Sequence, residues 1–444
     1  MILPSQRFRK DLSSILESAL LSVSPETLVK NSLRIEGDTL RIFNEEFNLS
    51  EYDNIHMIAI GKGAPSLCKG LMILLGNRIN RGIVISEEQY DPESENIVSL
   101  KGDHPFPGKN SLVSAGKLKQ FVKRVKNKDL VIALLTGGSS SMVVSPPEEI
   151  SINDLANVND LLLRSGAEIK EINTIRKHLS TIKGGMLAKM IHPARIISLI
   201  ISDVIGSDPE TIGSGLFSGD KTTFSDALKI MKKYNIEKKS GEKIIKYIKK
   251  GERGVISDTP SPADPEFKNN RTFVIGENIN ALNGAASMGN KLGYNTEILS
   301  DEENGDVRDA AQRFSEMIKN RAGKKGRGSE LLLFGGEFTV SVKGKGKGGR
   351  VQEFLLSVLK ELKDETFPYL IAGAGTDGKD GNSDSAGAWI DNRTTTKIEN
   401  TSYSKITRYL ADNDSNSFFG KIDQLIHSGP TGTNVMDIFF VFLG

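Results

Sequence analysis

The sequence predicts an α/β protein of two domains, the first with a doubly wound, mostly parallel sheet and the second a smaller α/β domain. Short apolar runs rich in β-branched residues end in Gly, Ser or Asp and alternate with segments of helical period, a pattern typical of βα units around buried strands. At 444 residues the chain is also too long for one ordinary domain. A composition shift between about residues 234 and 270 marks where the two domains would join.

The predicted elements begin with MILPSQRFRKDLSSILESAL, which reads as an amphipathic helix and lacks the long apolar core of a signal peptide. Five strand and loop pairs follow: residues 54–60 before GKGAP, 81–85 before SEE, 129–135 before TGGSSS, 194–202 before DVIGSD, and 368–375 before TDG. Ligands of parallel sheets bind at the carboxyl ends of the strands, so these loops are candidate sites.

The span from 235 to 270 is first Lys-rich and then Pro-rich, which predicts a basic helix followed by a linker. The domains are therefore expected at 1–235 and 236–444.

Composition and charge exclude several classes of protein. The formal net charge of +2 argues against broad nucleic-acid binding, which needs a concentrated basic face. The single cysteine, Cys68, rules out a disulfide framework within the chain. No apolar run is long enough to span a bilayer, so we expect a cytoplasmic protein without membrane contacts.

The stretch from Leu331 to Leu356 reads as a strand, a Gly-rich cationic turn and a helix. Gly348 and Gly349 precede Arg350, and Lys345 and Lys347 alternate with further glycines. Backbone without Cβ atoms and a positive helix N-terminus suit a polyphosphate. A solvated hairpin tip explains the same residues, and both interpretations stay open.

A second Gly-rich match, from Gly373 to Gly378, is followed by poor helix formers and by Asp377, which would repel a pyrophosphate. A dinucleotide site is therefore not expected there. Asp377, Asp380 and Asp384 fit either a cation-associated loop or a surface loop of Asx turns.

Three loops of the first half are polar at strand ends. Lys62 follows the strand 54–60, the loop Thr136–Ser141 offers N–H groups and hydroxyls to an oxyanion or begins a helix, and Asp203 is a metal, base or N-cap candidate. Arg176 lies in the predicted helix of residues 168–185, beside Lys177 and His178. Adjacent helical residues cannot all face one ligand, so a solvated basic face is the plainer interpretation.

Anion-friendly loops in both halves, cationic turns and strand-end aspartates favour phosphoryl transfer in a cleft between two domains. No Walker A motif and no Gly-x-Ser-x-Gly elbow occur. The residues alone thus predict a small-molecule kinase.

The motif set closely resembles the class II glycerate kinases, the glycerate 2-kinase family whose C-terminal region is called the MOFRL domain. The matching stretches, in order along nearly the whole chain, are GKGAPS, GDHPFPGKNS, TGGSSSM, RKHLSTIKGGMLA, SDVIGSDPETIGSG, FGGEFTVSVKGKGKGGRVQEF, AGTDGKDGNSDSAGAWID and SGPTGTNVMDI. The resemblance implies a Rossmann-like first domain, a MOFRL second domain, and ATP- and Mg²⁺- or other divalent-cation-dependent phosphorylation of D-glycerate at its 2-hydroxyl.

The resemblance also implies roles for individual residues. Lys62 and Arg350 stand where the family's proposed catalytic lysine and arginine stand, and Asp203 and Asp377 become metal candidates. Substrate or phosphate binding falls to Gly137, Gly138, Ser139, Ser140, Arg176, Glu337, Gly348 and Gly349. Val351 and Leu216 depart from the family's usual Asn and Pro.

Two other functions remain as alternatives: an NAD(P)-dependent hydroxypyruvate reductase, and a nucleotide-binding regulator without turnover. The resemblance leaves nucleotide, metal, stereospecificity and oligomeric state open, including a homodimer.

Overall fold

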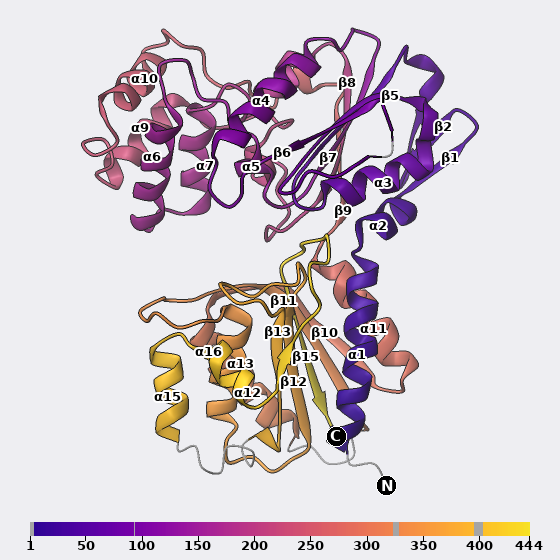
Figure 1. The fold of residues 1–444 in the computed structure, drawn as a ribbon, viewed down its shortest axis with the longest axis vertical. Coiled ribbons are helices and arrows are strands. Elements are labelled where there is room, and N and C mark those ends of the chain that lie inside the picture. The colour runs from indigo at the N-terminus through magenta and orange to yellow at the C-terminus, as the bar shows by residue number, and fades with distance from the viewer. Residues whose placement is uncertain (1–3, 93, 323–327, 395–402) are drawn as a thin grey trace. The chain divides into compact units, whose positions relative to one another are not determined.

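The computed structural model describes residues 4–92, 94–322, 328–394 and 403–444, and these fold into two compact units. We call Leu28–Ile275 the parallel-sheet unit, and Met1–Thr27 with Gly276–Gly444 the mixed-sheet unit (Figure 1). Each unit has its own six-stranded sheet.

The sheet of the parallel-sheet unit has the strand order β6-β5-β4-β7-β8-β9. Its strands are β4 (Ile55–Ile60), β5 (Ile79–Ser86), β6 (Ile97–Lys101), β7 (Leu130–Leu135), β8 (Arg195–Ile201) and β9 (Arg271–Gly276). The pairs from β6 to β8 are all parallel, and β4 and β7 are buried along their whole length. This confirms the predicted strands and their parallel order.

The helices of this unit are α2 (Pro25–Ser32), α3 (Ala64–Leu75), α4 (Lys109–Val122), α5 (Ser139–Met142), α6 (Ile152–Arg164), α7 (Ile169–His178), α8 (Met186–Ile191), α9 (Phe224–Lys233) and α10 (Glu242–Glu252). Helix α3 packs on β4 and β5, and apolar residues of α4 share a core with the sheet. Helices α6, α7, α9 and α10 gather into a separate helical layer (Figure 1). A small antiparallel meander, β1 (Leu33–Glu36), β2 (Thr39–Ile42) and β3 (Glu45–Asn48), completes the unit.

The second sheet has the order β10-β11-β15-β12-β13-β14. Its strands are β10 (Asn295–Asp306), β11 (Glu330–Thr339), β12 (Tyr369–Gly375), β13 (Gly387–Asp391), β14 (Leu425–Ile426) and β15 (Asp437–Leu443). Only β10 and β11 pair in parallel, and the other pairs are antiparallel. The strand predicted at 368–375 is confirmed as β12, but it pairs antiparallel with β13 and β15 and so does not belong to a parallel βα unit. The Gly-, Asp- and Ser-rich stretch after Gly375 favours turns over helix, and β12 returns directly as β13.

The helices of the mixed-sheet unit are α1 (Pro4–Ser22), α11 (Asn278–Lys291), α12 (Val307–Ala322), α13 (Arg350–Glu361), α15 (Tyr403–Ala411) and α16 (Ser415–Lys421). The predicted N-terminal helix is confirmed as α1, which lies along α11 (Figure 1). The hydroxyl of Ser18 donates to the carbonyl of Gly284 at 2.8 Å, and a Cβ at Gly284 would meet Ser22 Oγ at 2.3 Å. A glycine therefore lets the two helices touch.

The units divide the chain differently from the expected domains of 1–235 and 236–444. Residues 236–275 belong to the parallel-sheet unit, because Ile244 and Ile248 of α10 pack in the same hydrophobic core as apolar residues of α9. The Pro-rich stretch is also tied down there, since Asp220 donates its N–H to the Pro260 carbonyl at 2.8 Å. Residues 1–27 belong instead to the mixed-sheet unit through α1. Among the described helices, none combines the length and the apolar character that crossing a bilayer requires.

Candidate active site

The loops after β4 and β7 lie side by side at the carboxyl end of the parallel sheet. The N–H of Lys62 donates to the Gly137 carbonyl at 2.9 Å, and that of Gly63 donates to Thr136 Oγ1 at 3.0 Å. Gly61 has φ +130°, and a Cβ there would lie 2.2 Å from Thr136 Oγ1. The half-buried Lys62 is thus held against the 136–141 loop by a turn that favours glycine.

The loop from Thr136 to Ser141 begins the short helix α5, with Gly138 in the left-handed region at φ +85°. Ser139 is buried, and the hydroxyl of Ser140 lies 2.7 Å from that of Ser214. Of the two compatible interpretations, the helix start is therefore confirmed. The oxyanion role of Gly137, Gly138, Ser139 and Ser140 stays a prediction.

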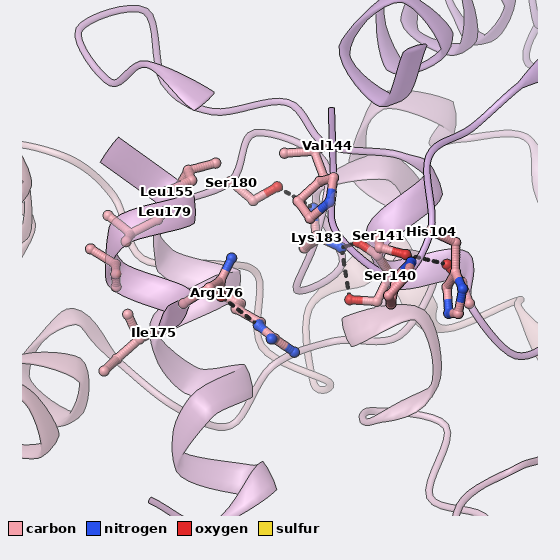
Figure 2. A pocket seen from close by; sticks show the side chains of 15 residues that line it. His104, Ser140, Ser141, Val144, Leu155, Ile175, Arg176, Leu179, Ser180 and Lys183 are labelled. Atoms are coloured by element: carbon pink, nitrogen blue, oxygen red, sulfur yellow. Dashed lines mark hydrogen bonds between the residues drawn. The ribbon is translucent and has the colours of Figure 1, made fainter. Parts of the chain in front are cut away.

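A pocket of about 210 Å³ opens beside this loop. Figure 2 shows Arg176 and Lys183 extending into it, with His104 and Ser140 nearby. Its lining consists of His104, Pro105, Pro107, Gly138, Ser140, Ser141, Val144, Leu155, Val158, Asn159, Ile175, Arg176, Leu179, Ser180 and Lys183. The pocket lining therefore combines apolar side chains with two cationic ones.

Lys183 is buried, with 4% of its surface exposed. Its Nζ donates to the carbonyl of Ser140 at 2.6 Å and to the Ser140 hydroxyl at 3.1 Å. Burial, together with the nearby Arg176 guanidinium, lowers the pKa of Lys183 to about 7. The side chain is accordingly poised between its charged and neutral forms near neutral pH.

The three basic residues at the end of α7 have different surroundings. Nε of Arg176 donates to Asn159 Oδ1 at 2.8 Å in the pocket wall, and burial lowers the pKa of Arg176. Lys177 is buried, and its Nζ lies 3.3 Å from Asp220 Oδ1. The His178 ring is also buried and packs edge-on to the ring of Phe224. The expected solvated basic face is therefore wrong, whereas the expectation that at most one or two of them reach a ligand fits Arg176 alone.

Asp203 follows β8 at the same edge of the sheet and is half-buried. Its position matches the predicted strand-end site. Among the described residues, no three His, Cys, Asp or Glu side chains gather closely enough to form a metal site by themselves. A single carboxylate can still hold Mg²⁺ when phosphate oxygens supply other ligands.

In the mixed-sheet unit, Arg350 begins α13 and bridges two carboxylates. Its Nε lies 2.5 Å from Asp437 Oδ2, and its Nη1 pairs with Glu337. Burial opposes the charge of Arg350, but Asp437 and Glu337 outweigh burial and raise its pKa. Of the predicted residues, Arg350 and Glu337 are thus in direct contact.

Asp380 occupies the N-terminus of α13. Its carboxylate accepts the backbone N–H groups of Val351 at 3.1 Å and Gln352 at 2.9 Å. Burial, and next the charge of Asp437, raise the pKa of Asp380 to about 7, and burial also raises the pKa of Asp437 to about 6. The anion at this helix N-terminus is therefore one of the protein's own side chains.

The Gly-rich turn before α13 is packed against other loops. Every backbone N–H from Lys343 to Gly348 donates to an oxygen of Asn382 or of residues 412–414. A Cβ at Gly349 would lie 2.1 Å from Asp380 Oδ1. The glycines thus permit close approach of neighbouring loops, while the side chains of Lys343, Lys345 and Lys347 are exposed to solvent. The polyphosphate role of this turn stays a prediction.

Asp377 lies half-buried in the loop between β12 and β13. Its Oδ1 accepts the N–H of Lys379 at 3.0 Å, which is an Asx turn. The negative charge of Asp377 also contributes to the raised pKa of Asp437. Asp377 therefore lies near Asp437, which pairs with Arg350.

The structure therefore gathers the predicted residues into two groups. Lys62, Gly137, Gly138, Ser139, Ser140, Arg176 and Asp203 belong to the parallel-sheet unit, and Glu337, Gly348, Gly349, Arg350 and Asp377 belong to the mixed-sheet unit. Sequence reasoning missed Lys183 and Asp437. Lys183 lay within a longer predicted helix, and Asp437 stood before an apolar strand, where a lone carboxylate gives no distinctive signal.

Two family models match separate stretches of the chain. Residues 11–249 match a domain of unknown function, DUF4147, and residues 330–437 match the MOFRL family. A glycerate 2-kinase from Pyrococcus horikoshii is 34% identical over 95% of this chain and 94% of its own length. A relative from Agrobacterium vitis, 33% identical over 98% of this chain, carries the provisional name of hydroxypyruvate reductase.

A solved structure of a glycerate kinase from Thermotoga maritima superimposes with a TM-score of 0.84 at 30% identity, covering 99% of this chain and 100% of that one. The similarity spans both units and reaches every motif quoted above. The chain therefore belongs to the class II glycerate 2-kinase family, with the MOFRL domain at its C-terminal end.

Proposed function

We propose that this protein transfers the γ-phosphoryl group of ATP to the 2-hydroxyl of D-glycerate and releases 2-phospho-D-glycerate. The observation that carries the proposal is the near full-length similarity to a glycerate 2-kinase. The cationic loops at the carboxyl end of the parallel sheet supply a physical basis, because phosphoryl transfer depends on positioning and charge neutralisation.

Lys62 is assigned to the transferring phosphoryl group. Its backbone hydrogen bond to Gly137 supports this role, because a fixed loop presents the ammonium group with little reorganisation. Gly138 and Ser140 border the adjoining pocket, and with Gly137 and Ser139 they are assigned to substrate and phosphate contacts.

Arg350 is assigned to the same phosphoryl group, so the reaction would take place between the two units. Glu337 and Asp437 fix the orientation of its guanidinium. Gly348 and Gly349 are assigned to phosphate binding, and they also let the preceding turn pack closely beside Arg350. Closure of one unit on the other would exclude water from the reaction.

Mg²⁺ or another divalent cation would be held by Asp203 and Asp377 together with phosphate oxygens. Bound there, it would neutralise charge on the β- and γ-phosphates. The proposal also keeps the cytoplasmic location expected from the sequence.

The test is a coupled assay on the purified chain with D-glycerate, ATP and Mg²⁺. Enolase and pyruvate kinase, added without a phosphoglycerate mutase, respond to 2-phosphoglycerate and not to 3-phosphoglycerate. Sustained pyruvate formation supports the proposal. A signal that needs added mutase would show that the 3-hydroxyl is phosphorylated instead.

The reductase named for the Agrobacterium vitis relative is the second candidate. It needs a nicotinamide dinucleotide, yet the Gly373–Gly378 match leads into the β12–β13 hairpin and not into a helix. Oxidation of NADH or NADPH with hydroxypyruvate would favour the reductase over the kinase.

A further inference from the structure

The pocket beside the 136–141 loop holds two cations without a carboxylate. None of its lining residues is Asp or Glu. Within the described chain, Arg176 and Lys183 bond neutral oxygens instead, of Asn159 and Ser140 respectively. Figure 2 shows both side chains reaching into the same space from different segments.

Two cationic side chains in one pocket destabilise the folded protein unless an anion binds between them. A buried charge without a partner is strongly disfavoured, and two like charges in one pocket add repulsion. Val144, Leu155 and Val158 are apolar residues of the pocket lining, and apolar surroundings lower the local dielectric and strengthen any ion pair made there. The residues therefore suit a small ligand with one anionic group.

We propose that Arg176 and Lys183 together bind the carboxylate of the acceptor, a small 2-hydroxy acid. This inference rests on the proposed function, and it adds the group that makes the enzyme choose an acid over a neutral polyol. Arg176 offers a planar fork that matches a carboxylate, and Lys183 offers a point charge from the other side.

The position of the pocket fits this role. Lys183 bonds Ser140, and Ser140 lies on the same short loop as Gly137, which accepts the Lys62 N–H. Lys183 and Lys62, the lysine assigned to the phosphoryl group, therefore both contact the 136–141 loop, so a carboxylate bound at Lys183 would lie beside the same loop as Lys62. The 2-hydroxyl is attached to the carbon next to the carboxylate, so a carboxylate bound at Lys183 would keep the 2-hydroxyl close to the 136–141 loop.

Proton uptake should accompany binding. The charged and titratable side chains that line the pocket with Lys183 are Arg176 and His104, and the pKa of Lys183 is lowered to about 7. At pH 8 most Lys183 is neutral, and a bound carboxylate favours its protonated form. The ligand therefore draws a proton from the buffer.

Steady-state kinetics of Lys183→Met and Arg176→Met test the inference. Each variant should raise KM for D-glycerate about tenfold to a hundredfold, the range for a lost hydrogen bond to a charged group, while KM for ATP stays within about twofold. Arg176→Lys keeps a positive charge and should recover part of the loss. The exposed Lys189→Met and Arg164→Met are matched controls that should behave as wild type.

Calorimetry supplies a readout independent of turnover. D-glycerate is titrated into the full chain at pH 8, without nucleotide, in two buffers of different ionisation enthalpy. Wild type and Lys189→Met should take up part of a proton per ligand bound, and Lys183→Met should take up none. A folded Lys183→Met protein with unchanged KM and unchanged proton uptake overturns the inference.

The inference and the proposed function fail in different ways. Turnover of D-glycerate with unaltered KM in both methionine variants removes the carboxylate site and leaves the kinase intact. Absence of any phosphoglycerate from the wild-type protein removes the kinase itself.

Discussion

The carboxylate of Asp380 accepts the N–H groups of Val351 and Gln352, the first residues after Arg350 in α13. A side chain from the loop after β12 thus caps the helix that carries the proposed catalytic arginine. Asp380→Ala should lower the free energy of unfolding by about 1–3 kcal/mol, because two buried N–H groups lose their acceptor. Asp380→Asn keeps one acceptor oxygen and should lose less. Urea unfolding measures both, and an Asp380→Ala protein as stable as wild type would show that the cap contributes nothing.

Lys62→Ala should reduce kcat by about a hundredfold or more, with little change in stability, if the ammonium group neutralises charge in the transition state. The half-buried side chain fills no core position. Lys69→Ala, an exposed change on α3, serves as the matched control. Full activity of Lys62→Ala in the coupled assay refutes the role.

Arg350→Ala should affect both activity and folding. It leaves the buried Asp437 without its partner, which costs about 3 kcal/mol for a pair that is partly open to solvent. Arg313→Ala breaks an exposed pair with Glu303 and should cost about 1 kcal/mol or less. Chemical unfolding monitored separately from kcat distinguishes the two effects, and equal stability losses in the two variants contradict the account.

Gly61→Ala should displace the Lys62 loop. The added Cβ would lie 2.6 Å from the Thr136 carbonyl oxygen, at a backbone φ that disfavours other residues. We expect a loss of about 2 kcal/mol, within the range for backbone strain, together with reduced kcat. Gly116→Ala, on an open face of α4, should instead stabilise the chain by about 0.5–1 kcal/mol. Unchanged activity of Gly61→Ala would mean that the loop tolerates movement.

The stability of the wild-type protein should contain a pH-dependent contribution from Lys183. Its folded pKa of about 7 lies below the ordinary value of 10.5, so between these values the unfolded chain binds the additional proton. The free energy of unfolding therefore rises with pH in this window, by up to about 1.4 kcal/mol per pH unit. Below pH 7 the destabilisation caused by burying the protonated Lys183 is fully present. Lys183→Met should lose this slope relative to wild type and Lys189→Met. Parallel pH profiles for all three contradict the lowered pKa.

The sequence predicted the parallel sheet and the two loops at its carboxyl edge because buried strands that end in Gly and Ser carry a local signal. It could not predict the antiparallel return of β12, since an Asp- and Gly-rich loop serves either topology. The pairing of Lys183 with the Ser140 loop depends on contacts between distant segments, and the packing of the Gly-rich turn against residues 412–416 does too. Such contacts leave no periodicity in the chain.

The phosphorus NMR spectrum of the product formed from D-glycerate and ATP shows which hydroxyl group carries the phosphate. A phosphate on the 2-hydroxyl is coupled to the single proton of C2, so phosphorylation at this position gives a doublet for the product. A triplet would place the phosphate on the CH₂ oxygen of C3 and contradict the account.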